Sequence, residues 1–368
     1  MKADVRELAR KIYEAPPLFK EAGGVTAEIK PVPDSDRQGV MDSREFYIRK
    51  ALYELQRKLP PAVPSLETIR RQTRTYCKPI SDTEIEERSF TLHSNGREIP
   101  VFYYDGRVDG AKDGTAALVY IHGGSFMAGM AESYAIPCRY TAEKAGCAVF
   151  NIEYSLAPEN PYPAAVEDCV SLVEYIYDNY KEFGIDRDRI ALCGDSAGGN
   201  LAVAAAMSCP DRIRIRRLEL FYPVVDLYSQ DGLYEWSEED YGIADEQRDV
   251  IESRLVLGRA DGKGDNSLME LILKAYLGER YEELKREPRV SMVYGDLSRL
   301  PACTVYSAEF DGLRLQEEYF ARRIKESGNE CRLIRYNGVS HAFLDYTGVV
   351  PQAEAALLEL AGELKSLA

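Results

Sequence analysis

Ser196 stands in the stretch LCGDSAGGN (residues 192–200), where an apolar strand pattern changes directly into an alanine-rich helical pattern. Gly194 and Gly198 lie two residues away on either side, and such a sharp turn needs small residues because side chains there would collide with neighbouring backbone. A serine held on such a turn is a candidate nucleophile, provided that a base accepts its proton. The G-x-S-x-G pattern alone equally describes an ordinary tight turn, so the partners decide its meaning.

The base can be sought by elimination, because the chain contains only three histidines. His93 lies near the turn of a predicted hairpin, and we expect it on the surface. His122 begins the stretch HGGSF, directly after an apolar strand and upstream of the serine. His341 follows the last predicted strand, at the strand end where open α/β sheets place their active sites. This position predicts His341 as the general base.

The acid that orients the base is expected between the serine and the histidine, if the order Ser…Asp/Glu…His holds. Asp311 ends the strand pattern TVYSAEF and is followed by Gly312. Glu309, on the same face of that strand, and Asp345, just after the histidine, are competitors. Asp311 is our prediction, as the third member of an ordered set.

Acyl transfer through a serine also requires donors for the negative charge of the tetrahedral intermediate. The small residues of HGGS, after a strand, let backbone N–H groups approach that charge closely. The N–H of Ala197, at the start of the helix after the serine, is a further donor, and the helix dipole there favours an anion. A flexible turn would be the simpler interpretation of HGG if no G-x-S-x-G followed it.

The elements that must position these residues alternate from about residue 85 onward. A hairpin is predicted to turn at Asn95–Gly96, because this dipeptide suits a two-residue turn. Apolar runs separated by helical patterns then indicate a mostly parallel central sheet that is covered by helices on both faces. The predicted strands are 116–122, 147–154, 189–194, 218–224, 303–310 and 331–336, and the predicted helices are 132–146, 163–180, 197–208, 314–327 and 352–367.

Two segments do not follow this alternation. Residues 1–84 have helical patterns and proline-rich connections, and we expect no strands there. Residues 227–290 are acidic, tyrosine-containing and helical in pattern, and a bare loop of this length is uncommon. We therefore predict a catalytic core of residues 85–226 and 291–368, and a helical cap assembled from residues 1–84 and 227–290.

Composition restricts the partners and the environment. The formal net charge of −15 argues against nucleic acid and anionic membranes as partners. The sequence shows neither an apolar signal segment nor a run long enough to span a membrane. Eight cysteines without C-x-x-C pairs indicate buried free thiols in a reducing compartment, with no metal site. We expect a soluble cytoplasmic protein without a cofactor, whose oligomeric state, homo-oligomer included, stays open.

Several ordered motifs together resemble the hormone-sensitive-lipase-like family of bacterial esterases, which has the α/β-hydrolase fold. The resemblance implies Ser196 as nucleophile, Asp311 as acid and His341 as base, with His122 structural. It also implies oxyanion donors at Gly124 and Ser125, completed by Ala197. The motifs are HGGSF (122–126), EYSLAPENPYPAAVEDC (153–169), GDSAGGNLA (194–202), PRVSMVYGDLSRLPAC (288–303), AEFDGLR (308–314) and HAF (341–343).

This chain departs from the family pattern at three places. Ser125 stands where the family often has a third glycine, and DGLRLQ replaces the commoner DPLRDE after the acid. The segment 227–290 is longer than usual in the family and is expected to shape the pocket. Together with the acidic stretch 236–249, these features predict a carboxylesterase for small, soluble, short-acyl esters and not an interfacial lipase.

The sequence leaves two alternatives open. An amidase or formamidase of the same fold would use the same triad, so the sequence does not separate ester from amide substrates. A non-catalytic receptor for a small ligand is the alternative from another class, and the presence of His341 counts against it.

Overall fold

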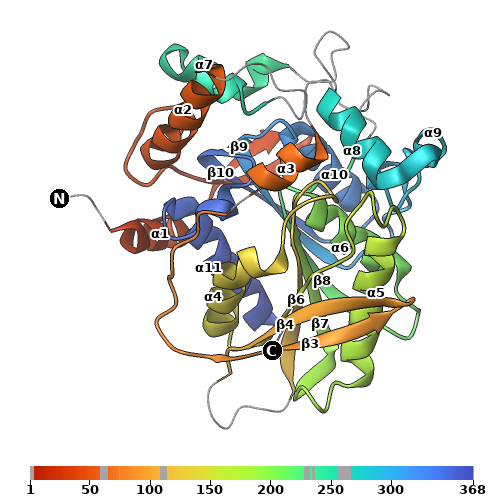
Figure 1. Cartoon of the computed structure of the whole chain (residues 1–368). Coiled ribbons are helices and arrows are strands. Elements are labelled where there is room, and N and C mark those ends of the chain that lie inside the picture. Colours follow the sequence, from red (N-terminus) through yellow and green to blue (C-terminus); the bar gives the residue numbers. More distant parts are fainter. Residues whose placement is uncertain are drawn as a thin grey trace.

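The computed structural model describes residues 4–58, 65–73, 75–107, 114–227, 233, 237–255 and 267–367. A ten-stranded sheet runs through the molecule in the order β1-β2-β10-β9-β8-β7-β5-β6-β4-β3 (Figure 1). The strands are β1 (Leu18–Ala22), β2 (Val25–Lys30), β3 (Glu86–Ser94), β4 (Arg97–Asp105), β5 (Thr115–Ile121), β6 (Ala148–Ile152), β7 (Ile185–Asp195), β8 (Ile215–Phe221), β9 (Ala302–Phe310) and β10 (Cys331–Ser340).

The central part of this sheet is parallel, as the alternation of strands and helices predicted. All neighbours from β2 through β10, β9, β8, β7 and β5 to β6 pair in parallel, whereas β1–β2, β3–β4 and β4–β6 pair antiparallel. The β3–β4 hairpin turns at Asn95 and Gly96, whose φ angles of 49° and 79° are those that a two-residue turn of this type requires. The predicted hairpin is therefore confirmed.

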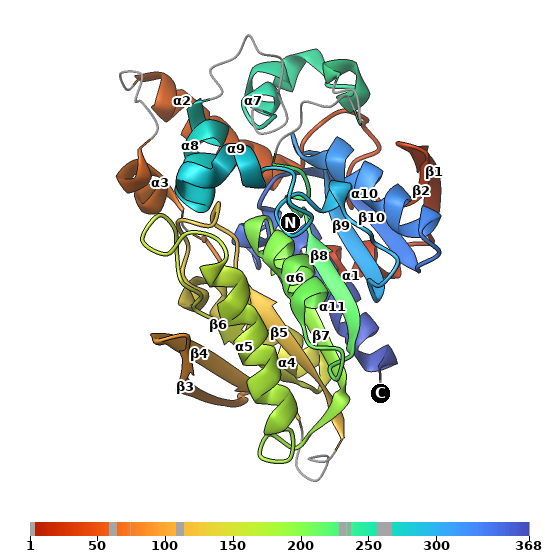
Figure 2. The ribbon, with the colours of Figure 1, turned by 90° about the vertical axis from the view of Figure 1, so that its right-hand side faces the viewer.

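Helices cover both faces of the sheet, which is the layered architecture expected for parallel strands (Figure 2). One face carries α1 (Val5–Glu14), α4 (Ala135–Ala145) and α11 (Pro351–Ser366), and the other carries α5 (Ala164–Asp178), α6 (Ala197–Ser208) and α10 (Arg314–Glu326). Each of the five predicted helices is present, and their ends agree within about three residues.

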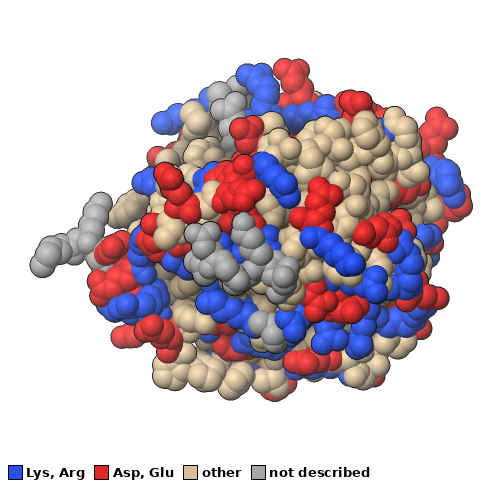
Figure 3. All heavy atoms as spheres, turned by 90° about the horizontal axis from the view of Figure 1, so that it is seen from below, with Lys and Arg blue, Asp and Glu red and all other residues tan. Residues whose placement is uncertain are grey.

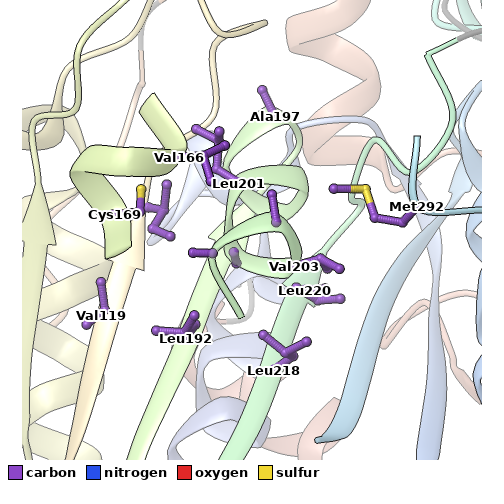
Figure 4. Close-up of a cluster of buried hydrophobic side chains, with 14 of the residues drawn as sticks. Val119, Val166, Cys169, Leu192, Ala197, Leu201, Val203, Leu218, Leu220 and Met292 are labelled. Carbon is purple, nitrogen blue, oxygen red and sulfur yellow. The ribbon is translucent and has the colours of Figure 1, made fainter. Parts of the chain in front are cut away.

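Two hydrophobic cores result, one on each face of the sheet. Along β7 the side chains alternate, so that Leu192 joins the core under α5 and α6 while Cys193 joins the core under α4 and α11. Figure 4 shows the first core, where Leu192 and Leu218 lie below Leu201 of α6. A leucine removed completely from water contributes on the order of 2 kcal/mol. Because Leu192 is buried four residues before Ser196, its packing helps to fix the end of β7.

The expectation that residues 1–84 contain no strand is wrong. β1 and β2 form a hairpin across Gly23 and Gly24, and β2 pairs in parallel with β10, so the hairpin extends the core sheet. The side chains of Val25, Ala27 and Ile29 are buried in alternation with more exposed neighbours, which is a strand pattern. The N-terminal helix α1 also belongs to the core, because it packs against α11.

The remaining helices lie together above the sheet, at the top of Figure 1. They are α2 (Ser43–Lys58), α3 (Leu66–Gln72), α7 (Arg248–Glu252), α8 (Ser267–Leu277) and α9 (Tyr281–Leu284). We propose that these helices form the cap, which therefore begins after β2. The helical expectation for 227–290 agrees with the described parts, whereas residues 228–232, 234–236 and 256–266 lie outside the described residues.

Short 3₁₀ helices connect several of these elements: η1 (Ala131–Tyr134), η2 (Glu238–Tyr241), η3 (Asp245–Gln247), η4 (Gly278–Arg280), η5 (Met292–Tyr294) and η6 (Phe343–Tyr346). All eight cysteines are free thiols, six of them buried and the other two half-buried. Within the described ranges, no helix is long and apolar enough to cross a membrane.

Candidate active site

Ser196 lies at the sharp turn between β7 and α6 that the glycine pattern predicted. Its φ of 54° and ψ of −117° lie outside the regions that a non-glycine residue usually adopts. The backbone N–H of Ser196 donates to the carbonyl of Phe221, 2.9 Å away, which helps to hold this conformation. A Cβ on Gly198 would lie 2.0 Å from the carbonyl oxygen of Ile121, so the close packing of helix on strand requires glycine there.

The structure brings Ser196, His341 and Asp311 into one hydrogen-bonded row. Ser196 Oγ lies 2.9 Å from Nε2 of His341, and Nδ1 of His341 lies 2.6 Å from Oδ2 of Asp311. Ser196 follows the end of β7, Asp311 the end of β9 and His341 the end of β10, so three strand ends at the same edge of the parallel sheet supply the three side chains, with β8 between β7 and β9. In this geometry the carboxylate can fix the imidazole tautomer that leaves Nε2 free to accept the serine proton.

The structure separates Asp311 from its two competitors. Asp311 is fully buried, and its other oxygen accepts a hydrogen bond from the backbone N–H of Leu313 at 2.8 Å. Glu309 instead accepts from the backbone N–H of Gly338 at 2.7 Å, and so ties β9 to β10. Asp345 lies 3.2 Å from the hydroxyl of Tyr134, whereas the carboxylate at Nδ1 of His341 is that of Asp311.

The loop after β5 presents backbone N–H groups beside Ser196. Gly124, Ser125 and Phe126 have φ angles of 130°, 56° and 64°, a run of left-handed conformations that aims this backbone. Within the described chain the N–H groups of Gly124 and Ser125 donate to no acceptor, whereas that of Gly123 donates to Asp195. Ala197 is the first residue of α6, so its N–H has no acceptor within the helix either. These are the three groups that the family resemblance implied as oxyanion donors.

The other two histidines take no part in this row. His122 is completely buried, stacks on Tyr154 with ring centroids 4.3 Å apart, and has Nδ1 2.8 Å from the carbonyl oxygen of Gly123. Burial lowers the pKa of His122 to about 4, so the ring is neutral at ordinary pH and holds the loop in place. His93 lies exposed on β3.

A buried link from the cap to the histidine loop was not predicted from the sequence. Arg49 of α2 donates from Nη2 to the carbonyl oxygen of His341 at 2.9 Å, and from Nη1 to the hydroxyl of Tyr346 at 3.1 Å. Its Nε donates to Glu45 one helical turn earlier, and Glu45 accepts two more hydrogen bonds from the backbone and side chain of Ser340. The only local signal is the Glu45–Arg49 spacing of four residues, which is common on exposed helices.

A buried carboxyl group, Asp195, and a half-buried one, Asp345, share one tyrosine beside the serine. The hydroxyl of Tyr134 donates to Oδ2 of Asp195 at 3.0 Å and also lies 3.2 Å from Oδ1 of Asp345. Burial raises the pKa of Asp195 to about 6, and burial together with the charge of Asp195 raises the pKa of Asp345 to about 7. A protonated Asp345 can donate to the tyrosine oxygen while the tyrosine donates to Asp195, which satisfies all three groups with two protons.

A cavity of about 570 Å³ opens onto Ser196 and His341, which is a size typical of sites for small molecules. Its floor comes from the sheet and its walls come largely from the cap, and apolar side chains dominate one side. The apolar wall residues include Leu52, Leu55, Ile69, Phe126, Val224, Leu227, Ile272 and Leu313. Among the described residues, no group of three or more His, Cys, Asp or Glu side chains could hold a metal ion.

The side of the molecule seen from below in Figure 3 shows Lys and Arg side chains intermixed with Asp and Glu side chains.

Comparison with known proteins agrees with this architecture. A family model described as alpha/beta hydrolase fold matches residues 118–345. An acetyl esterase of Salmonella dublin is 32% identical over 244 residues, which are 66% of this chain and 69% of the relative. The structure of a hyperthermophilic esterase from the archaeon Pyrobaculum calidifontis has a TM-score of 0.69 and 28% identity, covering 88% of this chain and 98% of that one.

A thermostable carboxylesterase cloned from a metagenomic library is similar in the same way. Its structure has a TM-score of 0.65 and 27% identity, covering 88% of this chain and 97% of that chain. The matched segment begins within β5 and ends after His341, so it spans the serine turn, the acid and the histidine. The chain therefore belongs to the α/β-hydrolase family, in the hormone-sensitive-lipase-like group that its motifs resemble.

Proposed function

We propose that the protein is a serine carboxylester hydrolase that cleaves small, soluble, short-acyl esters through an acyl-enzyme intermediate. The observation that carries this proposal is the hydrogen-bonded row from Ser196 through His341 to Asp311, at 2.9 Å and 2.6 Å, on a strained turn beside three backbone donors. The esterases among the similar proteins support the reaction class.

In the proposed reaction, Ser196 Oγ attacks the ester carbonyl while Nε2 of His341 takes its proton. The oxyanion receives hydrogen bonds from the N–H groups of Gly124, Ser125 and Ala197, and loss of one such donor typically costs a few kcal/mol of transition-state stabilisation. His341 then protonates the leaving alcohol, and Asp311 stabilises the imidazolium during both transfers. Water activated by the same histidine releases the acid from the serine.

The preference for short acyl groups is supported by Ser125, which lines the cavity next to Ser196 where the family often has a glycine. Each methylene buried against the apolar wall adds up to about 0.8 kcal/mol, so kcat/KM is expected to rise over a few carbons and then fall when the cavity is full. A series of p-nitrophenyl esters with acyl chains from two to sixteen carbons measures this. A maximum at twelve carbons or more, or activation when the substrate forms an emulsion, would identify a lipase instead.

The nucleophile is tested by Ser196→Ala. The variant is expected to lose about 10⁴- to 10⁶-fold in kcat for p-nitrophenyl butyrate, because the members of a triad act as a unit. A fluorophosphonate probe should label the unchanged protein and leave the variant unlabelled. Labelling of the variant would contradict the assignment, and anilide analogues of the same acids, assayed beside the esters, distinguish an amidase.

A further inference from the structure

The wall of the active-site cavity contains a guanidinium group that forms no ion pair with any carboxylate of the described residues. Arg254 follows α7 in the cap and lines the same cavity as Ser196 and His341. Its Nε is buried without a hydrogen-bond partner, and its side chain forms no ion pair within the part of the chain that the structure describes. A buried or half-buried arginine normally has a carboxylate or several acceptors, because an unpaired charge away from water is costly.

The carboxylates around Arg254 are bound to other groups. Glu45 accepts from Arg49 and Ser340, and Asp311 accepts from His341 and from the backbone after it. Asp345, the other acid whose charge acts on this guanidinium, lies beside the hydroxyl of Tyr134. None of the three forms an ion pair with Arg254, whose side chain lines the cavity beside Ser196 and His341.

A second guanidinium adds to the positive charge at this point. The positive charge of Arg49 and then burial lower the pKa of Arg254 to about 10, so the group stays protonated at neutral pH. Arg49 has Glu45 as a carboxylate partner, whereas Arg254 has none among the residues that the structure describes. An anion beside Arg254 would therefore stabilise this pair of neighbouring cations. Arg71 also lines the cavity but is well exposed and lies 3.6 Å from Glu67, so it already has a counter-charge.

We infer that Arg254 binds a carboxylate of the substrate, so that the preferred ester carries a negative charge in addition to its ester group. This inference depends on the proposed hydrolase function and narrows its substrate class. The apolar wall contacts the hydrocarbon part of such a molecule, Ser196 receives the ester carbonyl, and the guanidinium forms a bidentate contact with the carboxylate. Monoesters of dicarboxylic acids and O-acetylated hydroxy acids both have this chemistry.

Matched pairs of esters test the inference and locate the charge. For the acyl side, 4-nitrophenyl hemiglutarate is compared with 4-nitrophenyl valerate, which has the same chain length without the carboxylate. For the alcohol side, 4-acetoxybenzoate is compared with its methyl ester. The readout in each pair is the ratio of kcat/KM for the charged ester to that for the neutral ester, which cancels general losses of activity.

Arg254→Met removes the charge and keeps an unbranched side chain of similar length. For one of the two pairs, the ratio is expected to fall about 30-fold, as is usual when one partner of a partly buried charge pair is removed. Arg254→Lys should retain part of the preference, because the charge remains without the bidentate geometry. Arg71→Met is the matched control, and its ratio should stay within about threefold, as expected for an exposed charge.

The outcomes separate this inference from the function on which it depends. If the unchanged protein hydrolyses neither member of either pair, the proposed function fails. If it hydrolyses the neutral esters and Arg254→Met leaves both ratios within threefold, only the inference is overturned. If Arg254→Met does not fold, Arg254→Lys takes its place, together with a binding test on the unchanged protein. In that test, free glutarate and neutral 1,5-pentanediol compete with the hydrolysis of 4-nitrophenyl valerate. Weaker inhibition by glutarate than by 1,5-pentanediol would overturn the inference.

Discussion

The buried pair between Glu45 and Arg49 offers a sharp test of how the cap supports the histidine. Arg49→Met removes the hydrogen bonds to the carbonyl of His341 and to Tyr346, and it leaves the Glu45 carboxylate buried with only the two bonds from Ser340. Both side chains of the pair are almost fully buried, with 7% and 0% of their surface exposed. Solvent can therefore replace little of what is lost.

Removing one partner of a buried ion pair typically costs 3–5 kcal/mol, and the lower value applies because Glu45 keeps two donors. We therefore expect a decrease of about 3 kcal/mol in the free energy of unfolding. The entropy of unfolding at Tm is about 2.1 cal/mol/K per residue, or roughly 0.8 kcal/mol/K for a chain of this length, which converts the loss into a decrease of about 4 °C in Tm. Because the carbonyl of His341 loses its donor, kcat should fall by about 10- to 100-fold.

Urea unfolding and thermal unfolding measure the stability, and p-nitrophenyl butyrate measures kcat and KM. Glu45→Gln, Arg49→Met and the double variant form a double-mutant cycle. Each single change leaves an unpaired buried charge, so the double variant should be destabilised by about 2 kcal/mol less than the sum of the two single variants. Lys50→Met on the same helix is the control, because the Lys50–Glu54 pair is exposed at 3.9 Å and should contribute less than about 0.5 kcal/mol.

Additive effects in this cycle, or a loss of less than 1 kcal/mol for Arg49→Met, would refute the reasoning that the pair is coupled and desolvated. An unchanged kcat together with a lowered Tm would show that the link stabilises the cap without positioning the histidine.

Three further predictions follow from the site. Asp311→Asn should lower kcat by about 10⁴-fold, and Glu309→Gln by less than tenfold; the reverse result would show that Glu309 is the acid. In Gly124→Ala, the new Cβ would lie 2.0 Å from the carbonyl oxygen of Ala128, at a φ of 130°, so the backbone must move. The displaced N–H donor should lower kcat by at least about 10²-fold, which kinetics and a crystal structure of the variant measure. Burial raises the pKa of Asp345 to about 7, so the folded protein keeps a proton that the unfolded chain loses above about pH 4. The free energy of unfolding should therefore fall as the pH rises from about 4 to 7. Asp345→Asn should weaken that fall in urea unfolding at pH 4.5 and pH 7, and an identical pH dependence would contradict the assignment.

The parallel core could be predicted from the sequence because its strands are short apolar runs between helical patterns. The N-terminal hairpin could not, because four of the five residues of the edge strand β1 are exposed and give no apolar signal. The alternation of Val25, Ala27 and Ile29 after Gly23–Gly24 was a usable signal for β2. Its meaning depends on pairing with β10, some 300 residues later in the chain, and a local pattern does not contain that contact.

The candidate triad was accessible to sequence reasoning for a different reason. Histidine is rare in this chain, and chain order and strand ends limit the choice of base and acid. Arg49 and Arg254 were not accessible, because arginine is common and the role of each depends on burial. Arg49 contacts a carbonyl 292 residues away, and Arg254 is distinguished only by the absence of a partner among the described residues.

The N-terminal part of the chain supports the histidine from two sides, which explains why the sheet extends beyond β10. The strand β2 pairs with residues 333–336, so this part of β10 lies inside the sheet. Nearer to His341, the backbone N–H of Asp42 donates to the carbonyl oxygen of Gly338 at 2.7 Å. The chain then crosses to α2, where Arg49 binds the carbonyl of His341 from above. Because β10 is paired and the backbone of the His341 loop is hydrogen-bonded, the imidazole of His341 can move mainly by rotation about its own side-chain bonds. This restraint keeps Nε2 at 2.9 Å from Ser196 Oγ before substrate binds. Residues before 85 therefore support the candidate triad as well as the proposed cap.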